Sequence, residues 1–267
     1  MKILEDIKIL DSEIGNYSWI RADTQVSNSN IGRDVFIGFR CRINNAVIAD
    51  NVEIASNCII GGEGAEPVAL QRGCWLGADA VVKPGVRIGE GAVIGADTIV
   101  ENDVEQYSIV VGKPGKTIRK RSCVMDGLPE FRKMFNNYSP LNKDESGNLI
   151  SADWKKGNNL KVGQNNILIG KMSMGGGIFC GDNVTLGNGN ILEGAGSIYI
   201  GSNTKIGNNV HMISNSHDYT KQSFPMIFQP IKIGSGVTIG DGSIILGNIK
   251  ISDNKTIPSN SLVLKNK

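Results

Sequence analysis

The amino-acid sequence predicts an all-β protein built from two tandem parallel β-helices. Three observations support this prediction. Aliphatic residues recur every six positions, a small residue usually follows each of them, and this pattern occurs in two runs separated by an irregular stretch. An α-helix has a period of 3.6 residues and a half-buried strand a period of two, so neither explains a spacing of six. Six residues fit one short strand and one corner, and three such sides close a triangular coil.

The first run of repeats begins at Ile14. Corresponding members of its first three coils, Ile14, Ile31 and Ile48, are 17 residues apart, so one coil is three steps of six with one corner shortened by a residue. After a short interruption the stepping resumes and continues to Val100. The members of this run are Ile14, Ile20, Val26, Ile31, Ile37, Ile43, Ile48, Ile54, Ile60, Leu70, Leu76, Val82, Ile88, Ile94 and Val100.

The second run repeats this behaviour with two interruptions. Its members are Val162, Leu168, Met174, Cys180, Leu186, Leu192, Ile200, Ile206, Met212, Ile233, Ile239, Ile245, Ile251, Ile257 and Val263. We therefore expect a first β-helix over residues 1–112 and a second over residues 162–267. Residues 113–161 are expected to form a basic tail, one short amphipathic helix and a linker. The helix is predicted from the spacing of Leu128, Phe131, Phe135 and Tyr138.

The five cysteines contain no CxxC pair and are odd in number, which argues against a disulfide framework and a zinc site. Cys41, Cys58 and Cys74 fall on a second inward-facing position of the coil, together with Ala80, Ala92 and Ser243, and Cys180 replaces an aliphatic residue. We expect these four cysteines to pack in the core, and we expect no metal.

The composition excludes several classes of function. A net charge of +2 and an isoelectric point near 8.2 do not indicate a nucleic-acid partner. No apolar run approaches the roughly 20 residues of a membrane span, and the first residues contain no signal-peptide core. These features predict a soluble, cytoplasmic protein.

The repeat, an aliphatic residue followed by Gly and then a small residue three positions later, resembles that of the hexapeptide-repeat transferases. Residues 73–103 and 107–121 are similar to the C-terminal half of sugar and antibiotic O-acetyltransferases. The sequence SNSHDY at 214–219, followed by PIKIGSGVTIGDGSIIL at 230–246, resembles the galactoside, maltose and capsular-polysaccharide O-acetyltransferases. The resemblance implies left-handed β-helices, a homotrimer and use of acetyl-coenzyme A (acetyl-CoA).

The two halves differ at the same place in the coil. The inward positions Ile60 and Leu70 are ten residues apart, whereas the corresponding Met212 and Ile233 are twenty-one apart, and only the longer insertion contains a histidine, His217. We therefore expect the second half to be the catalytic one. The first half has no histidine, and we interpret it as a degenerate duplicate.

The resemblance implies an O-acetyltransferase that acts on a hydroxyl of a sugar or polysaccharide precursor by direct transfer in a ternary complex. Its general base would be His217, since imidazole has a reference pKa of about 6.5 and is mostly neutral near pH 7. Candidate partners for the second imidazole nitrogen are Asp218, Glu193 and backbone carbonyls. His211, the other histidine, is expected at the surface or at a trimer contact.

The resemblance also implies binding positions for both substrates. Asn188, Asn190 and Tyr219 are expected near the acceptor. Coenzyme A would lie along the coils after the histidine loop, around Gly240, Asp241, Ser259 and Lys265. Thr238 stands where the first half has Trp75, which is typical of the coil after the loop in this family.

Two other functions remain open from the sequence. An N-acetyltransferase that acts on an amino sugar or nucleotide sugar would use the same fold, and a non-catalytic β-helical scaffold would not bind coenzyme A. A carbonic anhydrase on this fold would need three histidines around a metal, and the chain has two.

Overall fold

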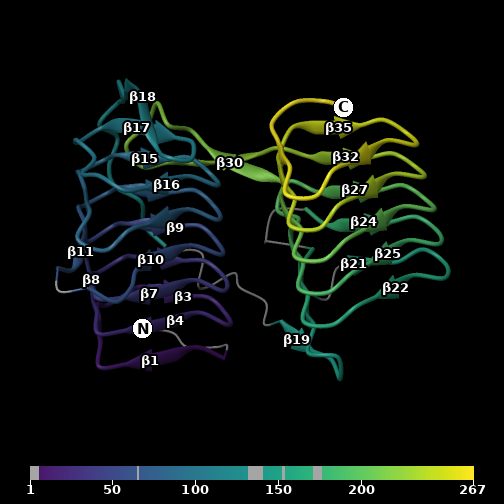
Figure 1. Ribbon diagram of the computed structural model, residues 1–267, viewed down its shortest axis with the longest axis horizontal. Coiled ribbons are helices and arrows are strands. Elements are labelled where there is room, and N and C mark those ends of the chain that lie inside the picture. Colours follow the sequence, from purple (N-terminus) through teal and green to yellow (C-terminus); the bar gives the residue numbers. More distant parts are fainter. Residues whose placement is uncertain (1–5, 65, 132–140, 152–153, 171–175) are drawn as a thin grey trace. The chain divides into compact units, whose positions relative to one another are not determined.

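A computed structural model describes residues 6–64, 66–131, 141–151, 154–170 and 176–267. The described chain is all-β and divides into two compact units (Figure 1). Unit 1 comprises residues 1–136 together with Asp218–Pro225, and unit 2 comprises Asn137–His217 and Met226–Lys267. A segment from late in the sequence is therefore part of the first unit. Each unit is a stack of parallel coils, consistent with the left-handed β-helix that was expected.

The coils of unit 1 form three sheets of short strands. The first, in spatial order, contains β1 (Lys8–Leu10), β4 (Gln25–Ser27), β7 (Arg42–Asn44), β10 (Ile59–Gly61), β13 (Val81–Val82) and β16 (Ile99–Val100). The second contains β14 (Arg87–Ile88), β11 (Val68–Leu70), β8 (Ala46–Ile48), β5 (Asn30–Ile31) and β2 (Glu13–Ile14). The third contains β18 (Lys116–Lys120), β17 (Ser108–Val111), β15 (Val93–Ile94), β12 (Trp75–Leu76), β9 (Glu53–Ile54), β6 (Phe36–Ile37) and β3 (Trp19–Ile20).

Unit 2 repeats this arrangement and adds a hairpin. Its first sheet contains β19 (Asn142–Lys143), β20 (Leu149–Ile150), β23 (Ile167–Ile169), β26 (Ile191–Glu193), β29 (His211–Ile213), β34 (Ile244–Leu246) and β37 (Leu262–Val263). Its second contains β21 (Trp154–Lys155), β24 (Ile178–Cys180), β27 (Ile198–Ile200), β32 (Ile231–Ile233) and β35 (Ile249–Ile251). Its third contains β22 (Lys161–Val162), β25 (Thr185–Leu186), β28 (Lys205–Ile206), β33 (Thr238–Ile239) and β36 (Thr256–Ile257), and the hairpin pairs β30 (Asn215–His217) with β31 (Met226–Phe228).

The aliphatic positions spaced by six fill the interior of each stack. In unit 1 the parallel pairing joins Val26 to Ile43 and Ile43 to Ile60, which confirms the 17-residue coil at this point. All three side chains are at most 1% exposed. The residue before each inward position points outward, as in Val47, which is 51% exposed beside Ile48 at 2%. This alternation is the period of a β-strand, superimposed on the six-residue spacing of the corners.

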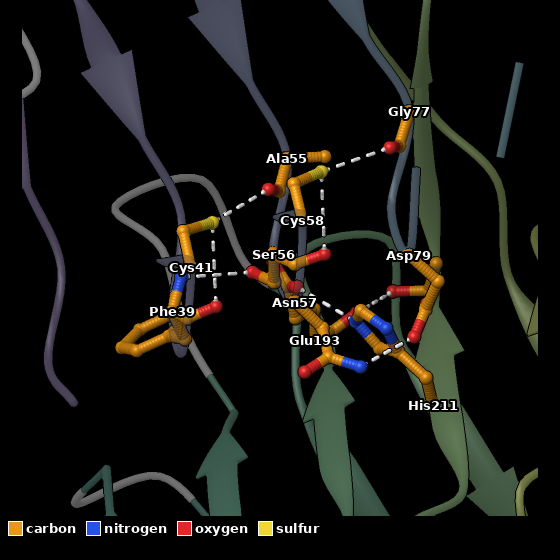
Figure 2. A network of polar contacts seen from close by, with 11 residues as sticks. Phe39, Cys41, Ala55, Ser56, Asn57, Cys58, Gly77, Asp79, Glu193 and His211 are labelled. Atoms are coloured by element: carbon orange, nitrogen blue, oxygen red, sulfur yellow. Dashed lines mark hydrogen bonds and ion pairs between the residues drawn. The ribbon is translucent and has the colours of Figure 1, made fainter. Parts of the chain in front are cut away.

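The cysteines on the inward positions pack as expected. Cys41, Cys58 and Cys74 are fully buried, and the thiols of Cys41 and Cys58 donate to the carbonyls of Ala55 and Gly77, each 3.2 Å away (Figure 2). Burial raises the pKa of the Cys74 thiol to about 12, so this group stays protonated at neutral pH. The five cysteines are free thiols.

The corners between strands use residues that tolerate the left-handed backbone region. Asn51, Asn57 and Asp79 have φ angles near +60°, and Asn or Asp recurs at matching corners of unit 2, for example at Asn203 and Asn209. Asn and Asp adopt this conformation more readily than other residues with a side chain, because their short polar groups form local hydrogen bonds. Where two coils approach closely, only glycine fits: a Cβ atom on Gly240 would lie 2.4 Å from the backbone nitrogen of Ser259.

The boundaries differ from those expected in two respects. The coils of unit 2 begin before residue 162, because β20 and β21 already pair in parallel with β23 and β24. Unit 1 continues past residue 112, because β18 forms an antiparallel hairpin with β17. The six-residue pattern does not predict β18, β20 and β21, because the run of aliphatic residues at that spacing does not extend to these strands.

The linker is not helical where it is described: Leu128 and Phe131 lie in irregular backbone. The rest of the expected helix, including Phe135 and Tyr138, lies outside the described residues, as does the inward position Met174. Among the residues that the structure describes, no helix has the length and hydropathy of a membrane span.

The outward face of one sheet of unit 1 is buried, whereas the outward residue Val47 of another sheet is exposed. The outward residues of its seven-stranded sheet include Trp19, Trp75, Val93 and Ile109, none more than 9% exposed. Phe131 packs against Phe36 of the same face, with ring centroids 5.5 Å apart. Tyr219 packs against Trp75, with centroids 5.2 Å apart. The residues after β18 and the segment Asp218–Pro225 thus help to cover this face.

The alternation of inward and outward residues gives a direct test of the fold. We expect Ile48→Ala to lower the free energy of unfolding by about 2 to 5 kcal/mol, because it removes a buried side chain from a packed coil. The adjacent change Val47→Ala should cost less than about 0.5 kcal/mol, because Val47 is exposed. Equilibrium unfolding in urea measures both values, and equal losses would contradict the assigned register.

Candidate active site

The candidate site is built around His217, the last residue of β30. In the hairpin, His217 pairs with Met226 and Ser216 with Ile227. The hairpin leaves the coil after β29 and returns before β32, so the insertion recognised in the sequence is an antiparallel excursion from a parallel stack. The His217 side chain is 8% exposed. A largely buried imidazole on a paired strand has few orientations available, which suits a group that must meet a reacting atom.

The residues after His217 form a tight turn. The Asp218 backbone N–H donates to the carbonyl of Pro225 at 2.9 Å, which closes the loop at its base. The Asp218 carboxylate accepts from the hydroxyl of Thr220 at 2.6 Å and from its backbone N–H at 3.0 Å. The hydroxyl contact is the main reason why the pKa of Asp218 lies below its usual value. Asp218 is therefore ionised at neutral pH and serves the local turn.

His211, expected at the surface or at a trimer contact, is not at the surface of the chain. It lies on β29 with its side chain directed out of the coil, but it is only 2% exposed. Its Nε2 atom is 3.1 Å from Oε1 of Glu193, the last residue of β26 (Figure 2). Glu193, one of the candidate partners for His217, thus contacts the other histidine. No sequence pattern predicts this pairing, because the two residues are 18 positions apart and meet only through the stacking of coils.

Asn190 lies in an internal ladder of asparagines. Its backbone N–H donates to Oδ1 of Asn166 at 2.8 Å, and its own Oδ1 accepts from the backbone N–H of Val210 at 2.7 Å. Its Nδ2 donates to the carbonyl of Gly187 at 3.1 Å, and the residue is fully buried. The amide of Asn190 is therefore engaged at both ends by the coil corners.

Asn188 and Asp241 belong to a second ladder, on the exposed side of the corners. The backbone N–H of Asn188 donates to Oδ1 of Asn208 at 2.8 Å, and that of Asn208 donates to Oδ1 of Asp241 at 2.9 Å. The bond from the Asn208 backbone is the main cause of the lowered pKa of Asp241. This acidic corner follows Gly240 directly, and Gly240 lies against Ser259 of the next coil. The structure thus brings together three of the four positions expected for coenzyme A; Lys265 lies beyond β37 and is exposed.

Tyr219 lies in unit 1, within an aromatic cluster. Its ring meets Trp75 edge to face at 5.2 Å and Phe224 at 6.1 Å. Arg121, from the basic tail after β18, lies with its guanidinium 4.2 Å from the centre of the Phe224 ring. The sequence did not predict this cluster, although a run of large apolar residues on outward positions, such as Trp19 and Trp75, is a signal that the face is covered.

Within the described parts of the chain, no three His, Cys, Asp or Glu side chains lie close enough together to bind a metal ion.

The chain is similar to known proteins over part of its length. Residues 68–102 match the family model for the bacterial transferase hexapeptide (six repeats). A chloramphenicol acetyltransferase of Agrobacterium fabrum (strain C58) is 55% identical over 47 residues, which cover 18% of this chain and 22% of the relative. The galactoside O-acetyltransferase of Escherichia coli (strain K12) is 29% identical over 134 residues, which cover 43% of this chain and 66% of the relative.

A third relative carries out a different acetyl transfer. The 2,3,4,5-tetrahydropyridine-2,6-dicarboxylate N-acetyltransferase of Staphylococcus aureus (strain JH9) is 35% identical over 85 residues, which cover 30% of this chain and 36% of the relative. The chain therefore spans between about a fifth and two thirds of the length of these three relatives.

Among solved structures, the chain is similar to AntD, an N-acyltransferase from Bacillus cereus in complex with dTDP and 3-hydroxybutyryl-CoA. The identity is 23% and the TM-score 0.41, over 43% of this chain and 77% of that one. The six-residue repeat, the parallel coils and the family match over residues 68–102 agree with one another. The chain contains hexapeptide repeats that fold as stacked parallel coils, and its resemblance to the hexapeptide-repeat acetyltransferases, galactoside O-acetyltransferase among them, is confirmed.

Proposed function

We propose that this protein is an acetyl-CoA-dependent O-acetyltransferase that works as a homotrimer and modifies a hydroxyl of a sugar or polysaccharide precursor. The observation that supports the proposal most is the place of His217. It is largely buried on a hairpin that leaves a regular coil, at the step where the first stack has only a short connection. The relatives named as acetyltransferases support the same reaction class.

The proposed reaction uses His217 as a general base. The neutral imidazole accepts the proton of the acceptor hydroxyl while the oxygen attacks the thioester carbonyl of acetyl-CoA. The tetrahedral intermediate then collapses, the carbon–sulfur bond breaks, and the thiolate of coenzyme A takes the proton from the imidazolium. Backbone N–H groups are suited to stabilise the oxyanion during this step.

Coenzyme A is proposed to lie along the corners that contain Gly240, Asp241 and Ser259. Gly240 lies against Ser259 of the next coil, so these two residues and Asp241 form one corner of the stack. Lys265, exposed after the last strand, is proposed to contact the phosphates. Asn188, Asn190 and Tyr219 are each proposed as contact residues for the acceptor.

Amine acceptors are the second candidate. The relative from Staphylococcus aureus is named an N-acetyltransferase, and a neutral imidazole could also take a proton from an amine during attack. The same assay distinguishes the two functions if it includes matched acceptors that carry either a hydroxyl or an amino group at one position.

Replacement of His217 tests the proposed base. We expect His217→Asn, which keeps a polar side chain of similar size, to lower kcat for acetyl transfer by about 10²- to 10⁴-fold while acetyl-CoA still binds. Release of coenzyme A, followed with a thiol reagent across a panel of sugars and amino sugars, measures the rate.

The matched control is His211→Asn, at the only other histidine of the chain. This change removes the contact with Glu193 and should lower thermal stability, while the protein that remains folded keeps most of its turnover. Full turnover in His217→Asn would refute the assignment of the base.

Asn190 offers a separate test of the acceptor site. The Asn190 side-chain amide accepts a hydrogen bond from the buried N–H of Val210 at the coil corner. Because Asn190→Ala removes this acceptor, we expect it to lower the free energy of unfolding by about 1 to 3 kcal/mol. Asn188→Ala, at an exposed corner, should cost less than about 1 kcal/mol. A raised KM for the acceptor with unchanged urea unfolding in Asn190→Ala would instead assign its amide to the acceptor.

A further inference from the structure

The segment Asp218–Pro225 follows His217 directly and is held within unit 1 by the residues after β18. Arg121 is central to this contact. It is only 7% exposed, and its backbone N–H donates to the carbonyl of Tyr107 at 2.6 Å, which fixes its place beside β17. Burial lowers the pKa of its guanidinium, which nevertheless remains charged at neutral pH.

The guanidinium of Arg121 donates three hydrogen bonds to backbone carbonyls. Nη1 donates to Gly91 at 2.7 Å, inside the coils of unit 1. Nε donates to Tyr219 at 3.0 Å and Nη2 to Lys221 at 2.8 Å, both in the segment after His217. One planar group thus ties two carbonyls of the loop to one of the coil stack, a task for which the fixed fork of arginine is suited and lysine is not.

Neighbouring contacts extend this attachment along the segment. The backbone of Val124 accepts from the N–H of Gln222 at 2.9 Å and donates to the carbonyl of Thr220 at 2.8 Å. Asp126 accepts from the hydroxyl of Ser223 at 2.8 Å. The Phe224 ring, 3% exposed, lies against the Arg121 guanidinium. A loop with these contacts is already ordered before a substrate binds, so substrate binding does not have to order it.

We infer that Arg121 is a positioning residue for His217, an inference that rests on the proposed function. Its bonds fix the backbone two and four residues after His217, and the bond between Asp218 and Pro225 closes the loop at its base. Loss of the guanidinium frees this segment and lets the imidazole leave its productive orientation.

The test compares Arg121→Met with Arg119→Met, a control in the exposed strand β18. In Arg121→Met we expect kcat to fall by about tenfold to a hundredfold, with KM for acetyl-CoA unchanged, because misplacement of a reacting group by about 1 Å has effects of this size. Trypsin should cut the native protein after Lys221 at least about tenfold faster, because local opening controls cleavage. Arg119→Met should change neither quantity.

A second readout does not depend on activity. The chain has two histidines, so their imidazole resonances can be assigned by NMR with the His217→Asn variant. We expect the resonances of His217 to shift or broaden in Arg121→Met while those of His211 stay in place. Arg121→Lys, which keeps the charge but not the three-way geometry, serves as the second variant and should show the same changes to a smaller degree.

Two results would overturn the inference: unchanged His217 resonances in Arg121→Met, or faster tryptic cleavage with unchanged kcat. A different result would refute the proposed function itself: full turnover in His217→Asn, whether or not the loop opens in Arg121→Met.

Discussion

The structure depends on the backbone hydrogen bonds that join each coil to the next. In unit 1 the N–H of Phe36 donates to Val52 at 2.9 Å and that of Gly38 to Ile54 at 2.8 Å, and similar bonds recur from coil to coil. This pairing sets the register, because a shift of either strand by one residue would turn its inward residue, Ile37 or Ile54, outward. A single coil could not bury its own aliphatic residues, so each coil is stable only against its neighbours.

The same constraint explains where the protein can carry functional loops. An insertion at a corner leaves the register intact if the chain returns to the next strand of the stack. Met212 still pairs with Ile245, although the hairpin of β30 and β31 lies between them in sequence. The corner that carries His217 is therefore a place where chemistry can be added without loss of the core, whereas Asn190 and Asn166, inside the corner ladder, serve the stack itself.

The sequence predicted the coils well because their determinants are local and periodic. The burial of Ile43, Ile60 and Cys58 follows from the six-residue spacing alone. Prediction from the sequence failed where a contact joins positions that are far apart in the chain. Arg121 contacts Tyr219, 98 residues away in sequence, and His211 contacts Glu193, 18 residues away. The start of unit 2 was missed for a related reason, since β20 and β21 are recognised only by their pairing with later strands. In the candidate site, the insertion containing His217 was visible in the sequence, but the attachment of the following segment to unit 1 was not.

Binding of acetyl-CoA tests the central claim most directly, because it requires no knowledge of the acceptor. Calorimetric titration of the full chain should give a dissociation constant in the micromolar range, about −8 kcal/mol in free energy. Absence of binding at millimolar acetyl-CoA would contradict the proposed enzyme and favour a β-helical scaffold whose histidine loop serves another purpose.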